Sequence, residues 1–168
     1  MLNHDAEAWQ IKLATLPLAS YGPGEAVFTE GTNTGRLMIL KTGAVSIVKG
    51  GIEIARVVEA GAVFGDLSIL LGQSHTADVR TLENSEFHVA DAATLMVQDP
   101  VALLYITMGL ARRLDAANQA LLELKYMLRA GESPSLIGKA VERIEGLLNS
   151  IGTGYVRAGA GYSGYPFA

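Results

Sequence analysis

Hydrophobic and polar positions follow two different patterns along the chain. From residue 18 to about residue 89, short runs rich in Val, Ile and Leu alternate with glycine-containing turns. After residue 91 these turns stop, and residues 92–130 carry the period of an α-helix. Turn signals at short, regular intervals are typical of antiparallel strands in a barrel or sandwich. The turns read PGE at 23–25, EGTNTG at 30–35, TGA at 42–44, KGG at 49–51 and EAGA at 59–62.

One of these turns, KGG at residues 49–51, separates the apolar runs VSIV and IEIARVV. Glycine adopts a positive φ without a steric penalty, and adjacent glycines suit the two-residue turns that join antiparallel strands. The sequence therefore predicts a β-hairpin around this turn.

Helical patterns flank the β region. Residues 5–16 predict a short amphipathic helix that ends near Pro17, and Pro100 is expected to open a long helix at its first turn. In the long helix, apolar residues recur at alternating intervals of four and three, at Leu110, Leu114, Ala117, Leu121, Leu124 and Leu128. This heptad seam indicates either contact with a second subunit or packing of the helix on its own domain.

The chain beyond residue 130 predicts one further helix. Gly131 is expected to end the long helix, and Ser133 followed by Pro134 is typical of a new helix start. The new helix, residues 134–149, places Ile137, Val141, Ile144 and Leu148 on one face. The chain thus divides into an N-terminal helix (1–17), a main domain with its C-terminal helix (18–130), an extra helix (131–151) and a glycine- and tyrosine-rich tail (152–168) of flexible composition.

Composition and charge narrow the classes of function. The 168 residues are 49% hydrophobic, and the formal net charge of −4 comes without any Lys/Arg-rich run, so we expect no nucleic-acid partner. The lack of cysteine excludes disulfides and thiolate metal sites and fits a cytoplasmic protein. The longest uncharged apolar stretch, residues 101–111, is shorter than the ~20 residues that span a bilayer, and no signal-peptide pattern is present. We expect no membrane partner.

An ordered set of glycines and flanking residues runs through the β region. It comprises Pro23-Gly24-Glu25, Phe28, Glu30-Gly31, Gly43, Gly61, Phe64-Gly65-Asp66-Leu67, Leu70-Leu71 and Thr76-Ala77-Asp78-Val79. In this order and spacing the chain resembles, from about residue 18 to 128, the cyclic nucleotide-binding domain family of catabolite-activator-type regulators, protein kinase A regulatory subunits and cyclic-nucleotide-gated channels. The resemblance implies a mainly β fold, an eight-stranded antiparallel β-roll with an N-terminal helix and C-terminal helices.

The resemblance also implies a phosphate-binding cassette, a short helix between two strands, at about residues 65–79. Gly65 permits a tight strand-to-helix turn, and the start of the helix offers backbone N–H groups and partial positive charge to an anion. The expected ligand is cAMP or cGMP, with no metal and no catalytic residue. The expected ligand-binding residues are Phe64, Gly65, Asp66, Leu67, Ser68, His75, Thr76 and Ala77.

Two cassette positions depart from the family pattern. Where relatives carry a glutamate that accepts a hydrogen bond from the ribose 2′-hydroxyl, this chain has Asp66, which either keeps that role or only caps the short helix. Where binding members carry the arginine that clamps the phosphate, this chain has His75, which is largely uncharged near neutral pH. Losing one charged hydrogen bond is expected to weaken binding about tenfold to a hundredfold.

Other residues refine this picture. Arg80 and Arg56, considered as replacements for the missing arginine, are expected on the surface. Thr76 falls where guanine-responsive relatives carry a threonine, which favours tolerance of cGMP. The three histidines, His4, His75 and His88, are isolated from one another in the sequence, so neither a metal site nor an enzyme is expected.

Two functions stay open from the sequence. In the first, the chain is a stand-alone regulatory domain that binds cAMP or cGMP weakly and signals through its C-terminal helices, with helix 101–130 contacting a protein partner or a second copy. In the second, it is a nucleotide-free interaction or dimerisation module that kept the fold and lost the pocket. The missing cassette arginine is the main support for the second function.

Overall fold

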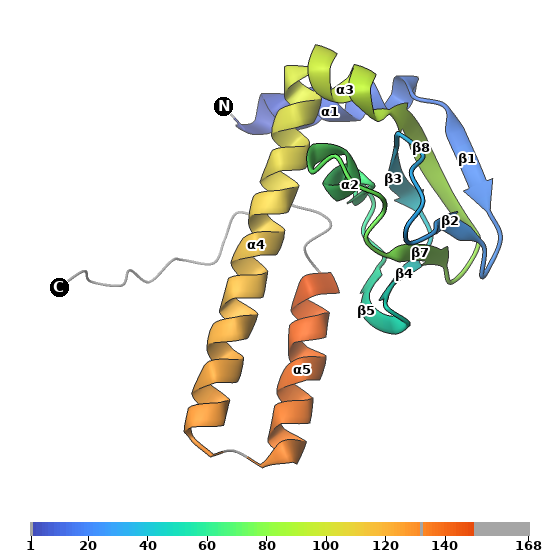
Figure 1. The fold of residues 1–168 in the computed structure, drawn as a ribbon. Coiled ribbons are helices and arrows are strands. Elements are labelled where there is room, and N and C mark those ends of the chain that lie inside the picture. The colour runs from blue at the N-terminus through green and yellow to red at the C-terminus, as the bar shows by residue number, and fades with distance from the viewer. Residues whose placement is uncertain (1, 132, 150–168) are drawn as a thin grey trace.

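Eight antiparallel strands in two sheets form the β region of the computed structural model, which describes residues 2–131 and 133–149 (Figure 1). One four-stranded sheet has the order β1-β8-β3-β6 and the other the order β2-β7-β4-β5. The predicted β-roll with flanking helices is confirmed. The strands are β1 (Leu18–Tyr21), β2 (Ala26–Phe28), β3 (Arg36–Thr42), β4 (Val45–Lys49), β5 (Ile52–Val57), β6 (Val63–Phe64), β7 (Asp78–Thr81) and β8 (Ser85–Asp91).

Residues from both sheets form one hydrophobic core. Because alternate side chains of a strand point to opposite faces, Met38 and Leu40 of β3 enter this core while Leu37 and Ile39 leave it on the other side. The buried residues of this core between the two sheets are Val27, Phe28, Met38, Leu40, Val45, Val57, Ala62, Phe64, Val79 and Phe87.

The predicted hairpin at residues 49–51 is present between β4 and β5. Lys49 pairs with Ile52, and the two glycines between them, Gly50 and Gly51, have φ angles of 57° and 80°. Both angles lie in the left-handed region that favours glycine, so the sequence signal and the backbone geometry agree.

A second core attaches the helices to the other face of β3. It is built by α1 (Leu2–Thr15), α3 (Ala92–Gln98) and the first turns of α4 (Pro100–Arg129). Trp9 of α1 is fully buried and stacks on Tyr105 of α4, with ring centroids 4.6 Å apart. The carboxylate of Asp99 accepts hydrogen bonds from the first backbone N–H groups of α4, as expected for a helix that opens with proline. The beginning of α4 is thereby fixed against the roll.

Beyond residue 130 the chain turns back, and α5 (Pro134–Asn149) runs antiparallel to α4 (Figure 1). Gly131 ends α4 with a φ of 67°, which confirms the predicted helix end, and the helix predicted over 134–149 is confirmed as well. The two helices pack closely around Ala120 and Ala140, which are both buried, and α5 also packs against β5. The predicted tail, residues 152–168, lies outside the described residues, and the domain boundaries at 17, 130 and 151 stay predictions.

The heptad seam of α4 is largely exposed. Leu114, Leu121 and Leu128 expose 63%, 51% and 59% of their surface, whereas Leu110 and Leu124 are half-buried. The neighbouring face of α4, which carries Ala120, is the one that α5 covers. When α4 packs on its own domain, an apolar stripe of three leucines, seven residues apart, therefore stays exposed on its surface.

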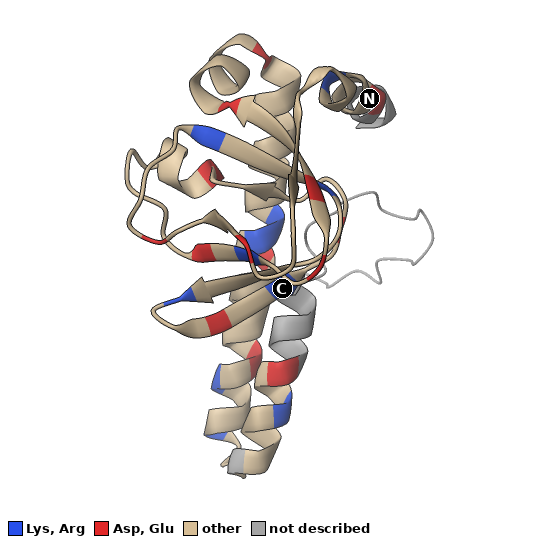
Figure 2. Cartoon of the chain, turned by 90° about the vertical axis from the view of Figure 1, so that its right-hand side faces the viewer, with Lys and Arg blue, Asp and Glu red and all other residues tan. Residues whose placement is uncertain are grey.

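Charge is dispersed over the part of the chain that the structure describes. Figure 2 shows Lys and Arg interspersed with Asp and Glu along the roll and along α4 and α5. Within residues 2–131 and 133–149, no single helix is long and apolar enough to cross a membrane. The pair α3 and α4, bent by 104°, meets that criterion by length and composition only.

Candidate functional site

The predicted cassette is a short helix, α2 (Asp66–Leu70), between β6 and β7. Gly65 precedes it with a φ of 90°, and a Cβ atom at this position would lie 2.6 Å from the carbonyl oxygen of Arg36 and 3.1 Å from the ring of Phe28. Glycine is therefore required both by the backbone angle and by the close approach of β3. The helix starts where the sequence predicts.

All eight residues predicted to bind ligand line one small cavity of about 80 Å³ at the cassette. A larger cavity of about 320 Å³ adjoins it and shares Phe64, Asp66, Leu67, Thr76 and Ala77 with it. Its volume lies at the lower end of the range for small-molecule pockets. The structure thus brings the predicted residues together around one space, while their binding of a ligand stays a prediction.

Helix α4 closes the larger cavity opposite the cassette. Tyr105, Ile106 and Gly109 line it from α4, and Ile47 and Ile54 line it from β4 and β5. Most of this wall is apolar, which suits the flat rings of a nucleobase. The space therefore lies between the roll and α4.

The imidazole of His75 is buried and already hydrogen-bonded. Its Nδ1 lies 3.2 Å from the hydroxyl of Ser68, and its Nε2 lies 3.0 Å from the hydroxyl of Thr34. The ring stacks on Phe28 with centroids 4.1 Å apart. Burial lowers the pKa of His75, so the ring is neutral at pH 7. His75 ties the cassette to the turn before β3 and offers no permanent charge to an anion.

The neutral state of His75 predicts a loss of stability in acid. Because its pKa is lower in the folded state than the unfolded value of about 6.5, the unfolded chain binds the proton more readily. The contribution to stability is complete above about pH 6.5 and falls as pH drops from there towards the folded pKa. In thermal unfolding at pH 7 to 5, we expect the Tm of the wild type to fall more steeply than that of His75→Gln.

His88 also contributes to the fall of Tm in acid, so His75→Gln is expected to remove only part of it. Burial also lowers its pKa, so the variant retains part of the acid sensitivity. Identical slopes for wild type and His75→Gln would contradict a buried, neutral His75.

The carboxylate of Asp66 has two partners in the structure. Its Oδ1 accepts a hydrogen bond of 3.0 Å from the N–H of Leu67, and its Oδ2 forms an ion pair with Arg113 of α4. The residue is 3% exposed, so the ion pair is shielded from water on the Asp66 side. Gly65, not Asp66, is the N-cap of α2. Asp66 therefore links the cassette directly to α4.

Sequence reasoning missed Arg113. The signal that points to it is the pair Arg112–Arg113, which interrupts the apolar pattern in the middle of α4. Both arginines line the larger cavity, together with Lys49 of β4. Among the described residues, three cations thus line this space with one carboxylate, Asp66, which favours an anionic ligand.

Backbone donors add to this charge. Within the described residues, the N–H groups of Thr76 and Ala77 make no hydrogen bond, and both residues line the two cavities. Unpaired backbone N–H groups are strong donors that favour an acceptor beside them. The cassette thus keeps donors for a ligand even though His75 is occupied.

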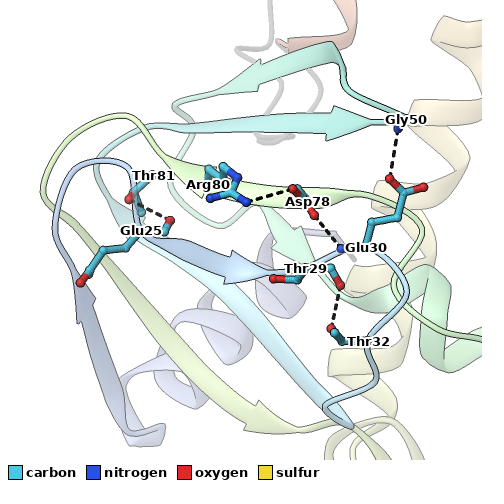
Figure 3. Close-up of polar contacts among 8 residues, drawn as sticks. All are labelled: Glu25, Thr29, Glu30, Thr32, Gly50, Asp78, Arg80 and Thr81. Carbon is cyan, nitrogen blue, oxygen red and sulfur yellow. Dashed lines mark hydrogen bonds and ion pairs between the residues drawn. The ribbon is translucent and has the colours of Figure 1, made fainter.

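The two arginines considered from the sequence lie on the surface, as expected. Arg80 pairs with Asp78 at 3.2 Å and Arg56 with Glu53 at 2.6 Å. Figure 3 shows that Asp78 also accepts a hydrogen bond from the N–H of Glu30. This hydrogen bond lowers the pKa of the Asp78 carboxyl, and its effect is larger than that of Arg80. The contacts of Asp78 fix the start of β7, immediately after the cassette.

The fold and the cavity define a ligand-binding β-roll whose pocket is closed by a C-terminal helix. Residues 18–106 match the cyclic nucleotide-binding domain family, and the chain belongs to this family. Members of the family are regulatory ligand-binding domains rather than catalytic ones. No curated protein matches the sequence.

Solved structures with the same fold include the catabolite activator protein of Thermus thermophilus. It is 22% identical, with a TM-score of 0.59 over 84% of this chain and 82% of that one. The CBD2 domain of PKAR bound to Sp-2Cl-cAMPS is 20% identical, with a TM-score of 0.54 over 75% and 80% of the two chains. At this level of identity the likeness establishes the fold alone.

Proposed function

We propose that the chain is a regulatory domain that binds cAMP or cGMP between α2 and α4 and transmits occupancy through α4. The observation that carries this proposal is a pair of adjoining cavities: all eight predicted residues line the smaller one, and α4 lines the larger one. A ligand in this position contacts both the rigid roll and the helix. It shifts the position of the helix only as far as it binds the two arrangements with different affinity.

The chemistry of the residues that line the two cavities favours binding of a cyclic nucleotide. The apolar surface of the larger cavity suits the base, and the unpaired N–H groups of Thr76 and Ala77 and the cationic side chains suit the phosphate. Thr76 lines both cavities, in keeping with the expected tolerance of cGMP. Asp66 lines both cavities, in keeping with its expected contact with the ribose hydroxyl of a nucleotide.

Titration calorimetry with purified protein tests the function. We expect saturable binding of cAMP or cGMP, weaker than in relatives that keep the cassette arginine, and much weaker binding of 5′-AMP because its phosphate is not closed into a ring. Absence of any heat with either cyclic nucleotide at millimolar concentration contradicts the proposal. It then favours the nucleotide-free interaction module.

The exposed stripe of α4 supports a second copy of the chain as partner. Leu114, Leu121 and Leu128 recur every seven residues, and Leu110, Ala117 and Leu124 complete the seam. A heptad seam is self-complementary because the same pattern on another helix presents matching knobs and holes. The proposed dimer therefore pairs α4 with α4, on the face that α5 leaves uncovered.

The double variant Leu114→Glu/Leu121→Glu tests this dimer. Charges at two core positions of the seam are expected to convert a dimer to a monomer, as measured by light scattering after gel filtration. Val97→Glu is the matched control, because Val97 is 82% exposed on α3, outside the stripe, and its variant should stay dimeric. A wild-type chain that is monomeric at high micromolar concentration contradicts the assignment.

A further inference from the structure

The cassette lacks a positively charged side chain of its own at the position where an anion is expected. His75, which replaces the family arginine, is neutral, buried and hydrogen-bonded through both ring nitrogens. An anionic ligand in the small cavity therefore needs a cation from another element. Within the described residues, Arg113 of α4 is the arginine or lysine that lines both the small and the large cavity.

Arg113 is held at the mouth of this space by Asp66. The Asp66 side chain is 4% exposed and the Arg113 side chain 39% exposed, so the guanidinium lies between the buried carboxylate and solvent. A buried carboxylate without a partner is costly, which gives the ion pair a strong preference for this arrangement. The guanidinium is consequently fixed beside the cassette before any ligand arrives.

The ion pair leaves most of the guanidinium donors unused. Arg113 contacts Asp66 through Nη2, and within the described residues its Nε and Nη1 groups make no hydrogen bond. A guanidinium carries five N–H donors in a planar fork, so one arginine can hold a carboxylate and a phosphate at the same time. Arg113 is therefore able to bridge Asp66 and an anion in the small cavity.

We infer that Arg113 supplies the cation that binds the phosphate of the ligand, in place of the missing cassette arginine. This inference rests on the proposed function and specifies where the charge comes from. The recognising cation then belongs to α4 itself and not to the cassette. The bound phosphate then contacts α4 directly through Arg113. Recognition of the phosphate charge and transmission of ligand occupancy to α4 therefore depend on the same side chain.

Calorimetry with cAMP on three variants tests the inference. Arg113→Gln should weaken binding about tenfold to a hundredfold, because it removes charged hydrogen bonds to the phosphate. Arg129→Gln, an exposed position in the last turn of α4, should bind like the wild type. Asp66→Asn should weaken binding as well, because Asp66 holds the guanidinium beside the cassette.

The pattern of outcomes separates the possibilities. A double variant Asp66→Asn/Arg113→Gln that binds cAMP as tightly as Asp66→Asn means that Arg113 only positions Asp66, which overturns the inference. Binding by Arg113→Gln at wild-type affinity also overturns it but leaves the proposed function standing, whereas a wild type that binds no cyclic nucleotide overturns both. If Arg113→Gln fails to fold because Asp66 loses its partner, the double variant Asp66→Asn/Arg113→Gln removes both charges and is compared with Asp66→Asn alone.

Discussion

Replacing Gly109 with leucine is expected to abolish cyclic nucleotide binding without loss of stability. Gly109 lines the larger cavity from α4, and a Cβ atom added there meets nothing within 4 Å. The leucine side chain therefore extends into open space that the ligand needs. Because glycine inside a helix is about 1 kcal/mol less favourable than alanine, the substitution should maintain or raise the free energy of unfolding.

The size of the effect and its control follow from the same geometry. A side chain that overlaps the ligand should weaken binding by at least about a hundredfold, since a steric clash excludes the bound position. Gly138→Leu on α5 is the matched control, because its added Cβ also meets nothing within 4 Å but the residue lines neither cavity. Calorimetry on both variants decides the matter. Wild-type affinity in Gly109→Leu would place the ligand elsewhere.

Gly65→Ala is expected to cost the fold about 2–5 kcal/mol. The new Cβ would combine left-handed backbone strain with a 2.6 Å contact to the carbonyl oxygen of Arg36. A backbone oxygen in a paired strand cannot rotate away as a side chain can. Such a loss is a large share of the stability of a typical domain, and denaturant unfolding measures it.

Gly72→Ala provides the comparison that isolates the contact. Gly72 follows α2 with a φ of 63°, so alanine there is strained as well, but its Cβ meets nothing within 4 Å. We expect a loss of about 1–2 kcal/mol from the backbone strain alone. Equal losses at the two glycines would show that close packing of Gly65 against β3 does not hold the cassette in place.

The sequence predicts the features whose causes are local. The turn at Gly50 and Gly51 and the ends of α4 depend on a few consecutive residues, so their chemistry is readable without the fold. The cassette is local in the same sense, because its eight predicted residues lie within fourteen positions, 64–77. They therefore come together around one cavity as soon as the strand, helix and turn form.

The features that the sequence does not reveal depend on contacts between distant residues. The ion pair of Asp66 joins positions 47 residues apart, and the Thr34 hydroxyl meets His75 across 41 residues. A search for a replacement arginine near the cassette in sequence reaches Arg80 and Arg56, but the strand direction carries them to the surface. Only the packing of α4 across the cavity brings Arg113 to the site.

The seam of α4 illustrates an intermediate case. Its heptad spacing is visible in the sequence, but the choice between packing on the domain and packing on another subunit is not. The structure shows that α5 covers the face of Ala120 and leaves Leu114, Leu121 and Leu128 exposed. The pattern thus predicts an apolar surface, and the fold decides which part of it stays available.

A crystal structure of the full chain grown with cAMP tests the central claim most directly. The account predicts nucleotide density between α2 and α4, with the cyclic phosphate beside the N–H groups of Thr76 and Ala77 and within hydrogen-bond distance of Arg113. Nucleotide bound outside this space, or side chains of the protein filling it at saturating cAMP, would contradict the account.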